Sequence, residues 1–324
     1  MTTMLEALKF VQGSIAKKEL VDELTHFQIK NGRVSGYNGV IALSSPIPFD
    51  LNCNPKAAEL IKAISNCDEN DTIQLSLTPG GKLTVKSAGF RVNIQSFNEP
   101  VHSYEPEGEV VEFDGEAFLQ GVKAVSPFIG QDASRKWSQG VLIKDSSFFA
   151  TNNVTLVQYW LGAVFPFEIN IPMPTVKEIL RIKEAPLSMQ VAENCFTLHY
   201  SGDRWLRSQY YSIKEWPDLG KILDRPFNPG PLDPAVFVGL EKMKSFVDPL
   251  GSIYFQGGLM TTHPDVAEAN ATFAVPSIQT EGLFNNQMLA LLEGVATHID
   301  WTTYPAPCLF SGDRLRGAIV GMRK

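Results

Sequence analysis

The chain repeats itself at intervals of 110 to 114 residues, and this internal repeat limits the possible folds more than any other feature. The string SGDRW begins at Ser201, SGDRL begins at Ser311, and a looser copy, SAGFR, begins at Ser87. Upstream, FQIKNGRVSGYNG from Phe27 aligns with VLIKDSSFFATNN from Val141 at an offset of 114 residues. This period is too long for a solenoid and matches the size of a domain. Chance similarity between strand-rich segments is the alternative, but the blocks recur in the same order.

Each copy of the repeat predicts two helices. The first helix of each copy is marked by apolar residues at helical spacing, namely Leu5, Leu8, Val11 and Ile15, then Phe118, Val122 and Val125, then Phe237, Leu240 and Met243. The second helix is predicted in the segments that begin at Asn54, Met173 and Leu283. We expect Pro55 and Pro174 in the first turns of two of these helices, where the missing N–H of proline has no cost.

Short strands are predicted around these helices. In the first copy Ile73, Leu75 and Leu77 alternate with polar residues, and the Pro-Gly-Gly that follows predicts a turn into a second alternating strand. We therefore predict an α+β fold of three similar domains, each with two helices packed on antiparallel sheet. Segments rich in proline, glycine and acidic residues set the domain boundaries, which gives domains at 1–105, 106–227 and 228–324.

The net charge and the cysteines exclude several classes of protein. The chain has 28 Lys and Arg against 35 Asp and Glu, and this charge of −7 argues against a globally basic nucleic-acid binder or a binder of anionic membranes. A locally basic surface is still compatible with this charge. We expect neither a transmembrane helix nor a signal peptide, because the necessary apolar segments are missing. Four scattered cysteines without a CxxC pair favour reduced thiols and a cytoplasmic protein.

The sequence has no recognisable catalytic motif. Its five histidines are isolated, and neither they nor the cysteines have the spacing of a zinc site. There is no P-loop and no GxSxG nucleophile elbow, and the QGGL string at Gly257 lacks the strand–loop–helix context of a dinucleotide site. We therefore predict a protein without enzymatic activity, metal or cofactor. The alternative is an enzyme whose acid pair is assembled only in the folded protein.

Lysine and arginine are frequent in and around the predicted helices of this acidic protein. Because these basic residues recur in the repeats, we predict that one face of the helices is directed at a polyanion. The alternative is that they lie on an ordinary solvated helix surface. The residues expected on the basic face are Lys9, Lys17, Lys18, Lys62, Lys123, Arg135, Lys136, Lys177, Arg181, Lys183 and Lys244.

Several longer motifs follow one another in a family-specific order. The first repeat contains LTHFQIKNGRVSGYNG, NPKAAELIKAI and LTVKSAGFRVNIQSF, and the second contains FLQGVKAVSPFIGQDASRKWSQGVLI, FATNNVTL and KEWPDLGKIL. The chain ends in GAIVGMRK. In this order the motifs resemble the bacterial DNA sliding clamp, the beta subunit and processivity factor of DNA polymerase III. The resemblance covers nearly the whole chain.

The resemblance implies a non-catalytic protein of three clamp domains per protomer, with helices inside and sheet outside. Two protomers would close head to tail into a six-domain ring around double-stranded DNA. Such a homodimer needs only weak, sequence-independent phosphate contacts. It would tether DNA polymerase, clamp loader and other proteins that carry clamp-binding motifs. The alternative function is a phage structural or adaptor protein that reuses the clamp scaffold without encircling DNA.

The resemblance also implies a pocket for partner peptides between the second and third domains. Apolar walls with a few polar groups suit an anchored linear motif. The alternative is that its apolar residues are ordinary inter-domain core. By motif position the pocket residues are Thr151, Asn153, Leu156, Pro217, Lys221, Ile222, Pro307, Val320, Gly321, Met322 and Arg323.

The chain departs from the family pattern at several points. A helix is predicted almost at Met1, where the family usually begins with a strand. The family's Thr-Asp-Gly-His-Arg-Leu is replaced by TNNVTL from Thr151, and its terminal Met-Pro-Met-Arg by VGMR from Val320. The chain is also shorter than a typical clamp. These departures lead to the hypothesis of a divergent clamp, of phage or prophage origin, that serves a dedicated polymerase.

Overall fold

The computed structural model describes residues 3–16, 21–67, 71–99 and 101–323. The chain forms two compact units, each assembled from two stretches of sequence. The first unit comprises Met1–Leu119 and Pro174–Tyr210, and the second comprises Gln120–Met173 and Tyr211–Lys324. The residues of the predicted second domain are therefore divided between the two units.

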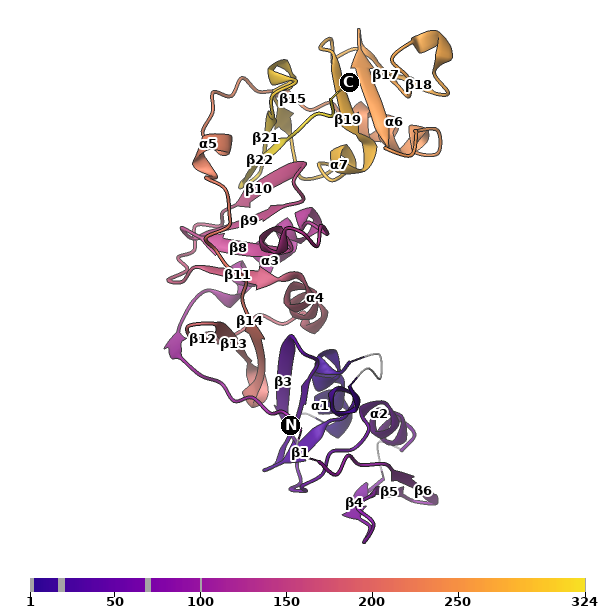
Figure 1. Ribbon diagram of the computed structural model, residues 1–324, viewed down its shortest axis with the longest axis vertical. Helices are drawn as coiled ribbons and strands as arrows, with labels where there is room; N and C mark the ends of the chain where they lie inside the picture. Colours follow the sequence, from indigo (N-terminus) through magenta and orange to yellow (C-terminus); the bar gives the residue numbers. More distant parts are fainter. Residues whose placement is uncertain (1–2, 17–20, 68–70, 100, 324) are drawn as a thin grey trace. The chain divides into compact units, whose positions relative to one another are not determined.

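The first unit is built on a seven-stranded antiparallel sheet (Figure 1). The strands in spatial order are β1 (Gln28–Lys30), β2 (Arg33–Tyr37), β3 (Ile41–Pro46), β14 (Arg204–Gln209), β13 (Cys195–Tyr200), β12 (Ser188–Val191) and β7 (Glu109–Val111). β3 pairs with β14, so that Ser44 lies opposite Trp205. This pairing joins strands of the first and second repeats into one sheet.

Helix α1 (Met4–Val11) packs against β2 and β3 in the first unit. Thr3 and Glu6 form a capping box at its N-terminus, and Leu8 and Val11 are fully buried. The helix ends at Val11, so that Ile15 lies beyond it, contrary to the predicted apolar face. The chain continues there as a 3-10 turn over Gln12–Ser14. Gly13 in this turn lies against the Glu178 carboxylate, and an added Cβ would be 1.9 Å from a carboxylate oxygen.

The two predicted first-turn prolines have different positions. α4 (Met173–Ile182) contains Pro174 as its second residue, as predicted. α2 (Ala57–Ser65) begins after Pro55, and the prediction for this proline is wrong. Pro55 instead forms a β-bridge with Ser96, and its carbonyl accepts a hydrogen bond of 3.0 Å from the Phe27 amide. Because Pro55 is paired in an extended conformation, α2 begins only at Ala57.

A separate three-stranded sheet completes the first unit. Its strands are β4 (Gln74–Leu77), β5 (Leu83–Ser87) and β6 (Phe90–Ile94), in that spatial order. The predicted hairpin is confirmed, with Leu77 opposite Leu83. Leu83 and Val85 are fully buried, whereas Leu77 is 42% exposed on the edge strand.

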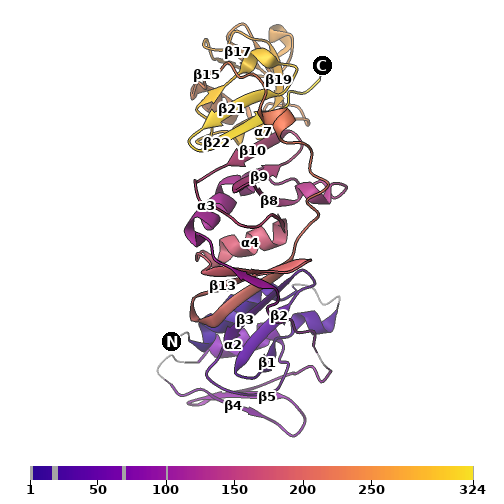
Figure 2. The same ribbon diagram turned by 90° about the vertical axis from the view of Figure 1, so that its left-hand side faces the viewer.

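The second unit contains an eight-stranded and a four-stranded antiparallel sheet (Figures 1 and 2). The larger sheet has the order β11 (Ile169–Pro172), β8 (Gly140–Lys144), β9 (Ser147–Thr151), β10 (Thr155–Tyr159), β22 (Leu315–Ile319), β21 (Cys308–Gly312), β20 (His298–Ile299) and β15 (Gly230–Pro231). The smaller sheet has the order β18 (Thr272–Ala274), β17 (Leu259–Thr261), β16 (Ser252–Gln256) and β19 (Gly282–Asn285). β10 pairs with β22, and this pairing joins the second and third repeats.

The other predicted helices are present. They are α3 (Gly115–Val125), α6 (Ala235–Met243) and α7 (Asn286–Ala290), with a short additional helix α5 (Gly220–Leu223). The predicted apolar residues Phe118, Val122 and Val125 are fully buried. Short 3-10 turns lie at Gln12–Ser14, Asp22–Thr25, Ser126–Phe128, Lys136–Ser138, Ser201–Asp203, Val266–Glu268 and Trp301–Thr303.

Three hairpins have the same two-residue turn at matching places in the repeats. Their central residues all have positive φ, as type I′ turns require, and are Asn31-Gly32, Asp145-Ser146 and Gly257-Gly258. The two asparagines at offset 114 also match. Asn38 Oδ1 accepts from the amides of residues 40 and 41, and Asn152 Oδ1 accepts from those of residues 154 and 155. The first and second repeats therefore share local hydrogen bonds as well as the order of their elements.

The SGDR strings occupy equivalent hairpins, but their turns differ. In the second repeat Tyr200 lies opposite Arg204 across a three-residue turn. In the third repeat Gly312 lies opposite Leu315 across a two-residue turn. Identical residues therefore adopt different backbone conformations in the two hairpins.

Candidate partner-binding site

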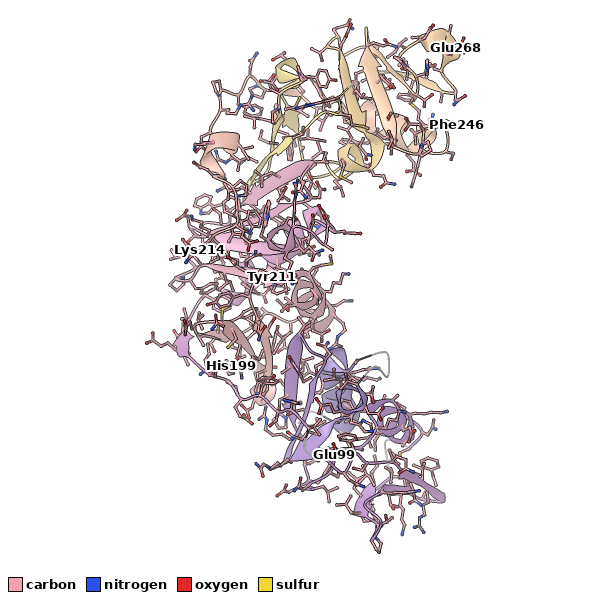
Figure 3. The ribbon with its side chains drawn as sticks, in the orientation of Figure 1. Glu99, His199, Tyr211, Lys214, Phe246 and Glu268 are labelled. Carbon is pink, nitrogen blue, oxygen red and sulfur yellow. The ribbon has the colours of Figure 1, made fainter. Side chains whose placement is uncertain are left out.

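Residues 211–224, called the connector below, lie along one face of the eight-stranded sheet. Figure 3 labels Tyr211 and Lys214 near the start of the connector. The Tyr211 amide donates to the Asn170 carbonyl at 2.8 Å, and burial raises the pKa of the Tyr211 hydroxyl. The half-buried side chains of the connector pack on a buried apolar cluster. The connector residues are Ile213, Trp216, Leu219 and Ile222, and the cluster is Leu142, Phe149, Leu156, Leu223, Leu309 and Ala318.

A cavity of about 550 Å³, called the connector cavity below, lies between the connector and the sheet. Its apolar lining includes Phe149, Trp216 and Pro217, and its polar lining includes Gln158 and Arg316. Arg316 Nε donates to Gln158 Oε1 at 2.7 Å. The Trp216 indole N–H is buried and has no hydrogen-bond partner among the described residues. The cavity thus combines an apolar wall with an oriented guanidinium group.

A second cavity of about 710 Å³, called the C-terminal hollow below, lies beside the last residues of the chain. It is larger and mostly apolar, and its lining comes from the segment after α3, from the turn between β9 and β10, from α7 and its flanking residues, and from the C-terminal segment. The lining residues are Pro127, Ile129, Gln131, Asn152, Asn153, Val154, Asn285, Gln287, Met288, Leu291, Val320, Gly321 and Met322.

Backbone and side-chain hydrogen bonds fix the C-terminal segment at this hollow. The Val320 amide donates to the Val154 carbonyl at 2.8 Å, and the Tyr304 hydroxyl donates to the Met322 carbonyl at 3.1 Å. Gly321 packs directly on the Tyr304 ring, where an added Cβ would be 2.4 Å from a ring carbon. Position 321 therefore has no room for a side chain.

The turn between β9 and β10 forms another wall of the C-terminal hollow. Thr151 Oγ1 donates to the Thr155 carbonyl at 2.7 Å and accepts from the Asn153 amide at 3.1 Å. Asn153 has a φ of 71°, which asparagine adopts more readily than most residues. Its side-chain oxygen accepts a hydrogen bond of 2.9 Å from Arg135. Thr151 thus braces the turn from inside while Asn153 faces the hollow.

The residues of the predicted pocket fall into five groups. Asn153, Val320, Gly321 and Met322 line the C-terminal hollow, and Pro217 lines the connector cavity. Leu156, which is 6% exposed, and Ile222 pack in the apolar cluster. Thr151 is buried in the turn. Lys221, Pro307 and Arg323 line neither cavity, and Lys221 pairs with Asp218 at 3.5 Å in an exposed ion pair.

Most of the predicted basic residues that the structure describes are exposed on or near helices. Lys17 and Lys18 lie outside the described residues. In the first unit Lys9 is on α1, Lys62 on α2 and Lys177 on α4, with Lys183 directly after α4. In the second unit the exposed residues are Lys123 on α3, Arg135 and Lys136 at the turn that follows, and Lys244 directly after α6.

Three of the predicted basic residues already have partners. Arg181 donates to both carboxylate oxygens of Glu178 and to the carbonyls of Lys9 and Phe10, so its guanidinium group is engaged within the protein. Arg135 binds Asn153 at the C-terminal hollow. Lys244 pairs with Glu241 at 3.6 Å in an exposed, weak ion pair. Arg181 therefore has a structural contact that the sequence did not predict.

Among the described residues, no group of three or more His, Cys, Asp or Glu side chains is placed to hold a metal ion. None of the helices in the described part of the chain is long and apolar enough to cross a membrane.

Several residues of the two cavities were not predicted from the sequence. Trp216 and Arg316 of the connector cavity and Met288 of the C-terminal hollow are examples. Their place depends on contacts between distant segments. One signal was present, because apolar residues recur every third position along the connector at 213, 216, 219 and 222.

By sequence, no family model and no curated protein matches this chain. By structure, it is similar to solved DNA polymerase III beta sliding clamps. The DNA polymerase III subunit beta of Pseudomonas aeruginosa superimposes with a TM-score of 0.82 at 16% identity, covering 99% of this chain and 98% of that chain. The DNA polymerase sliding clamp of Caulobacter crescentus gives a TM-score of 0.81 at 15% identity, with the same coverage.

A third similar structure is the sliding clamp of Bartonella birtlesii bound to griselimycin. Its TM-score is 0.81 at 14% identity, and the match covers 99% of this chain and 97% of that chain. The chain therefore has the sliding-clamp fold over essentially its whole length, although the sequences have diverged widely.

Proposed function

We propose that this chain is a non-catalytic DNA sliding clamp that acts in the cytoplasm as a homodimeric ring. One observation carries the proposal, namely a fold match that covers 97–98% of the beta clamps described above as well as 99% of this chain. Each protomer contributes three domains, at 1–105, 106–227 and 228–324. The ring encircles duplex DNA and tethers a polymerase and other partners.

The distribution of charge supports a ring that slides. Exposed lysines such as Lys62, Lys123 and Lys177 lie on helices, whereas the whole chain has a charge of −7. A few weak phosphate contacts on an acidic protein hold DNA without stopping its movement. Retention then depends on topology more than on affinity.

Open sheet edges support closure of the ring. The three-stranded sheet of the first unit ends in β4 and β6, and the four-stranded sheet of the second unit ends in β18 and β19. Unpaired edge strands are ready templates for pairing with another chain. Phe246 and Leu250, near the second of these sheets in sequence, are 50% and 67% exposed. Head-to-tail pairing of the two kinds of edge closes a twofold ring.

The C-terminal hollow is the proposed site for partner peptides. It has the mostly apolar lining and the few polar groups that anchor a short linear motif. Asn153, whose side-chain oxygen accepts from Arg135, supplies a polar group of its lining, and Met288 and Met322 supply adaptable apolar walls.

Retention on circular DNA tests the proposal. We expect a dimer of the 35.8 kDa chain at micromolar concentration by native mass measurement, with a central hole in small-angle scattering. Protein bound to nicked circular plasmid should elute with it and be lost when the plasmid is linearised. A strict monomer, or retention that survives linearisation as expected for an adaptor protein, would contradict the proposal.

A further inference from the structure

A third cavity of about 510 Å³, called the strand-end cavity below, lies on the eight-stranded sheet where β10 ends and β22 begins. Trp160, Gly312, Arg314 and Leu315 line this cavity and do not line the connector cavity, although the two cavities share part of their polar lining. The connector, which the structure describes in full, contributes no residue to it. A cavity of this size is large enough for a small-molecule ligand.

Trp160 presents an exposed aromatic ring at this cavity. It directly follows β10 and is 56% exposed. Its amide donates to the Arg314 carbonyl at 3.0 Å, which extends the pairing of β10 with β22 by one residue and holds the two residues next to each other. Neither the ring nor the indole N–H of Trp160 has a partner among the described residues. The ring is therefore available to a ligand beside a cationic side chain.

Arg314 is the arginine of the SGDR string in the third repeat, and its counterpart in the second repeat has a different role. Arg204 has an extended backbone with a φ of −91°, donates to Glu184 at 2.6 Å and lies over the Phe10 ring. Arg314 lies in the shorter turn and is exposed, and its guanidinium group has no hydrogen-bond or ion-pair partner in the described part of the chain. The change of turn therefore releases this arginine from the fold.

Two charged residues of the lining have an unfavourable backbone conformation. Arg314 has a φ of 52°, and Asp145, in the turn between β8 and β9, has a φ of 47°. Residues other than glycine are uncommon in this region, and strained backbone is frequent at binding sites. The Asp145 carboxylate, like the Arg314 guanidinium group, has no side-chain partner among the described residues. Both charges are thus displayed at the cavity at a conformational cost.

The remaining polar side chains of the lining form a fixed row. Gln158 Nε2 donates to Ser147 Oγ at 3.0 Å, and Gln158 Oε1 accepts from Arg316 Nε at 2.7 Å. Arg316 also donates to Asp224 at 2.8 Å in an exposed ion pair. Because these side chains bind one another, a ligand meets them as a rigid polar surface.

We propose that the strand-end cavity binds a single nucleotide, with its base stacked on Trp160, its phosphate bound by Arg314 and a sugar hydroxyl donating to Asp145. An exposed aromatic ring is a stacking platform for any nucleobase. A guanidinium group binds phosphate through paired N–H donors, and a carboxylate accepts from ribose hydroxyls. The inference goes beyond the proposed function, because it gives the chain a small-molecule ligand away from DNA and partner proteins.

The charges of the lining favour a single nucleotide over a nucleic-acid strand. Its charged residues are Arg314, Arg316 and Asp145, and Arg316 is already paired with Asp224. One unpaired cation and one unpaired carboxylate therefore face a ligand. A strand requires a positively charged groove that follows successive phosphates. One phosphate and one sugar match the available pair of charges better.

Titration of the full-length protein with AMP and with adenosine tests the proposal. Binding is followed by NMR through the indole N–H signal of Trp160, assigned with Trp160→Phe. We expect AMP to shift this signal and to bind about tenfold more tightly than adenosine, because only AMP offers a phosphate to Arg314. The dideoxy form of AMP, which lacks both sugar hydroxyls, should bind about fivefold more weakly than AMP.

Variants at the two principal contacts should separate stacking from phosphate binding. Trp160→Ala should weaken AMP binding about tenfold in calorimetry, because the base loses its platform. Arg314→Gln should bind AMP and adenosine equally. Arg314→Gly suits the positive φ, so it should lose the same preference without losing thermal stability, and it serves if Arg314→Gln disturbs the turn.

The matched control is Lys214→Gln, which removes an exposed cation outside the cavity and should leave the affinity for AMP unchanged. Equal binding of AMP and adenosine by the unaltered protein, or unchanged AMP binding in Trp160→Ala, overturns the proposal. A shift of the Trp160 signal by oligothymidylate but not by AMP also overturns it, because the surface then binds a strand. Failure here leaves retention on circular DNA unaffected, so the two proposals fail separately.

Discussion

Arg181 forms hydrogen bonds with both carboxylate oxygens of Glu178, one turn earlier on α4, at distances of 2.5 to 2.9 Å. Glu178 is only 6% exposed, and the guanidinium group also donates to the carbonyls of Lys9 and Phe10 at the end of α1. The pair therefore joins two helices that are far apart in sequence.

Removal of this arginine should destabilise the first unit. In Arg181→Ala the Glu178 carboxylate stays buried without its partner, and we expect a loss of about 2 kcal/mol in the free energy of unfolding. Urea denaturation measures the loss, and Lys177→Ala, at an exposed position on the same helix, is the control. If the urea midpoint of Arg181→Ala is unchanged, Arg181 does not stabilise the fold and is available to contact DNA.

The lysines on the helices should contribute to DNA retention. Combined Lys62→Ala, Lys123→Ala and Lys177→Ala should weaken association with duplex DNA and reduce its salt dependence, because fewer counterions are released. Binding at several salt concentrations gives the slope. Lys30→Ala with Lys86→Ala, on strands, is the control. Equal slopes for all variants would mean that DNA contacts another surface.

Acid should weaken a contact in the turn between β13 and β14. Glu184 is partly buried, which disfavours its charge, yet hydrogen bonds from Ser201 and Arg204 outweigh the burial and hold its pKa below the usual value. A lowered folded-state pKa stabilises the fold above the unfolded pKa, and this contribution is lost as the pH falls through the folded pKa. Glu184→Gln should cost about 1 kcal/mol at neutral pH and progressively less in acid. Unfolding measured from pH 7 to pH 3, beside the exposed control Glu109→Gln, checks this expectation.

A methyl group at Gly321 should disturb the C-terminal hollow. Its Cβ would clash with the Tyr304 ring, and we expect Gly321→Ala to cost about 1–3 kcal/mol and to weaken peptide binding there. At Gly230 an added Cβ would be 3.8 Å from the Ile299 carbonyl, so Gly230→Ala is the matched control. Thermal unfolding and partner-peptide titration measure the two effects. If Gly321→Ala has the same thermal stability and peptide affinity as Gly230→Ala, the C-terminal segment is only loosely held.

The matching asparagines allow a test of the repeat itself. Asn38→Ala and Asn152→Ala should each cost about 1 kcal/mol, because two backbone amides lose their acceptor. Asn→Asp keeps the acceptor oxygen and should cost less at either position. The two losses should add in the double variant, since the residues lie in different units. Unequal losses at the two positions would show that only one of the turns depends on its asparagine.

The sequence predicted the repeated elements well and the details of their junctions poorly. Helical periodicity located α1, α3 and α6, and alternation located the β4–β5 hairpin, because these patterns depend on local burial. Pro55 was misplaced because its pairing with Ser96 keeps the local backbone extended, and Ile15 was misplaced because a 3-10 turn follows the α-helix after Val11. The SGDR strings show the same limit, since one tetrapeptide adopts two turns.

The candidate site was predicted only in part for a similar reason. Motif order located Asn153, Pro217 and the C-terminal segment at cavities, because their positions follow the elements that carry them. The ion pair of Arg316 with Asp224 joins residues 92 positions apart in a surface cavity, where no periodic pattern constrains the residue types. Contacts of that kind between distant residues cannot be predicted from the sequence, because they depend on how the folded strands lie beside one another.

The pairing of β3 with β14, and of β10 with β22, has a consequence for how the molecule comes apart. A fragment cut at either predicted boundary would have an unpaired strand edge in both pieces, so the repeats are not autonomous folding units. Cooperative melting should follow the hydrogen-bonded sheets. The first repeat then unfolds together with β12 to β14, and the last strands of the chain are lost together with β8 to β10.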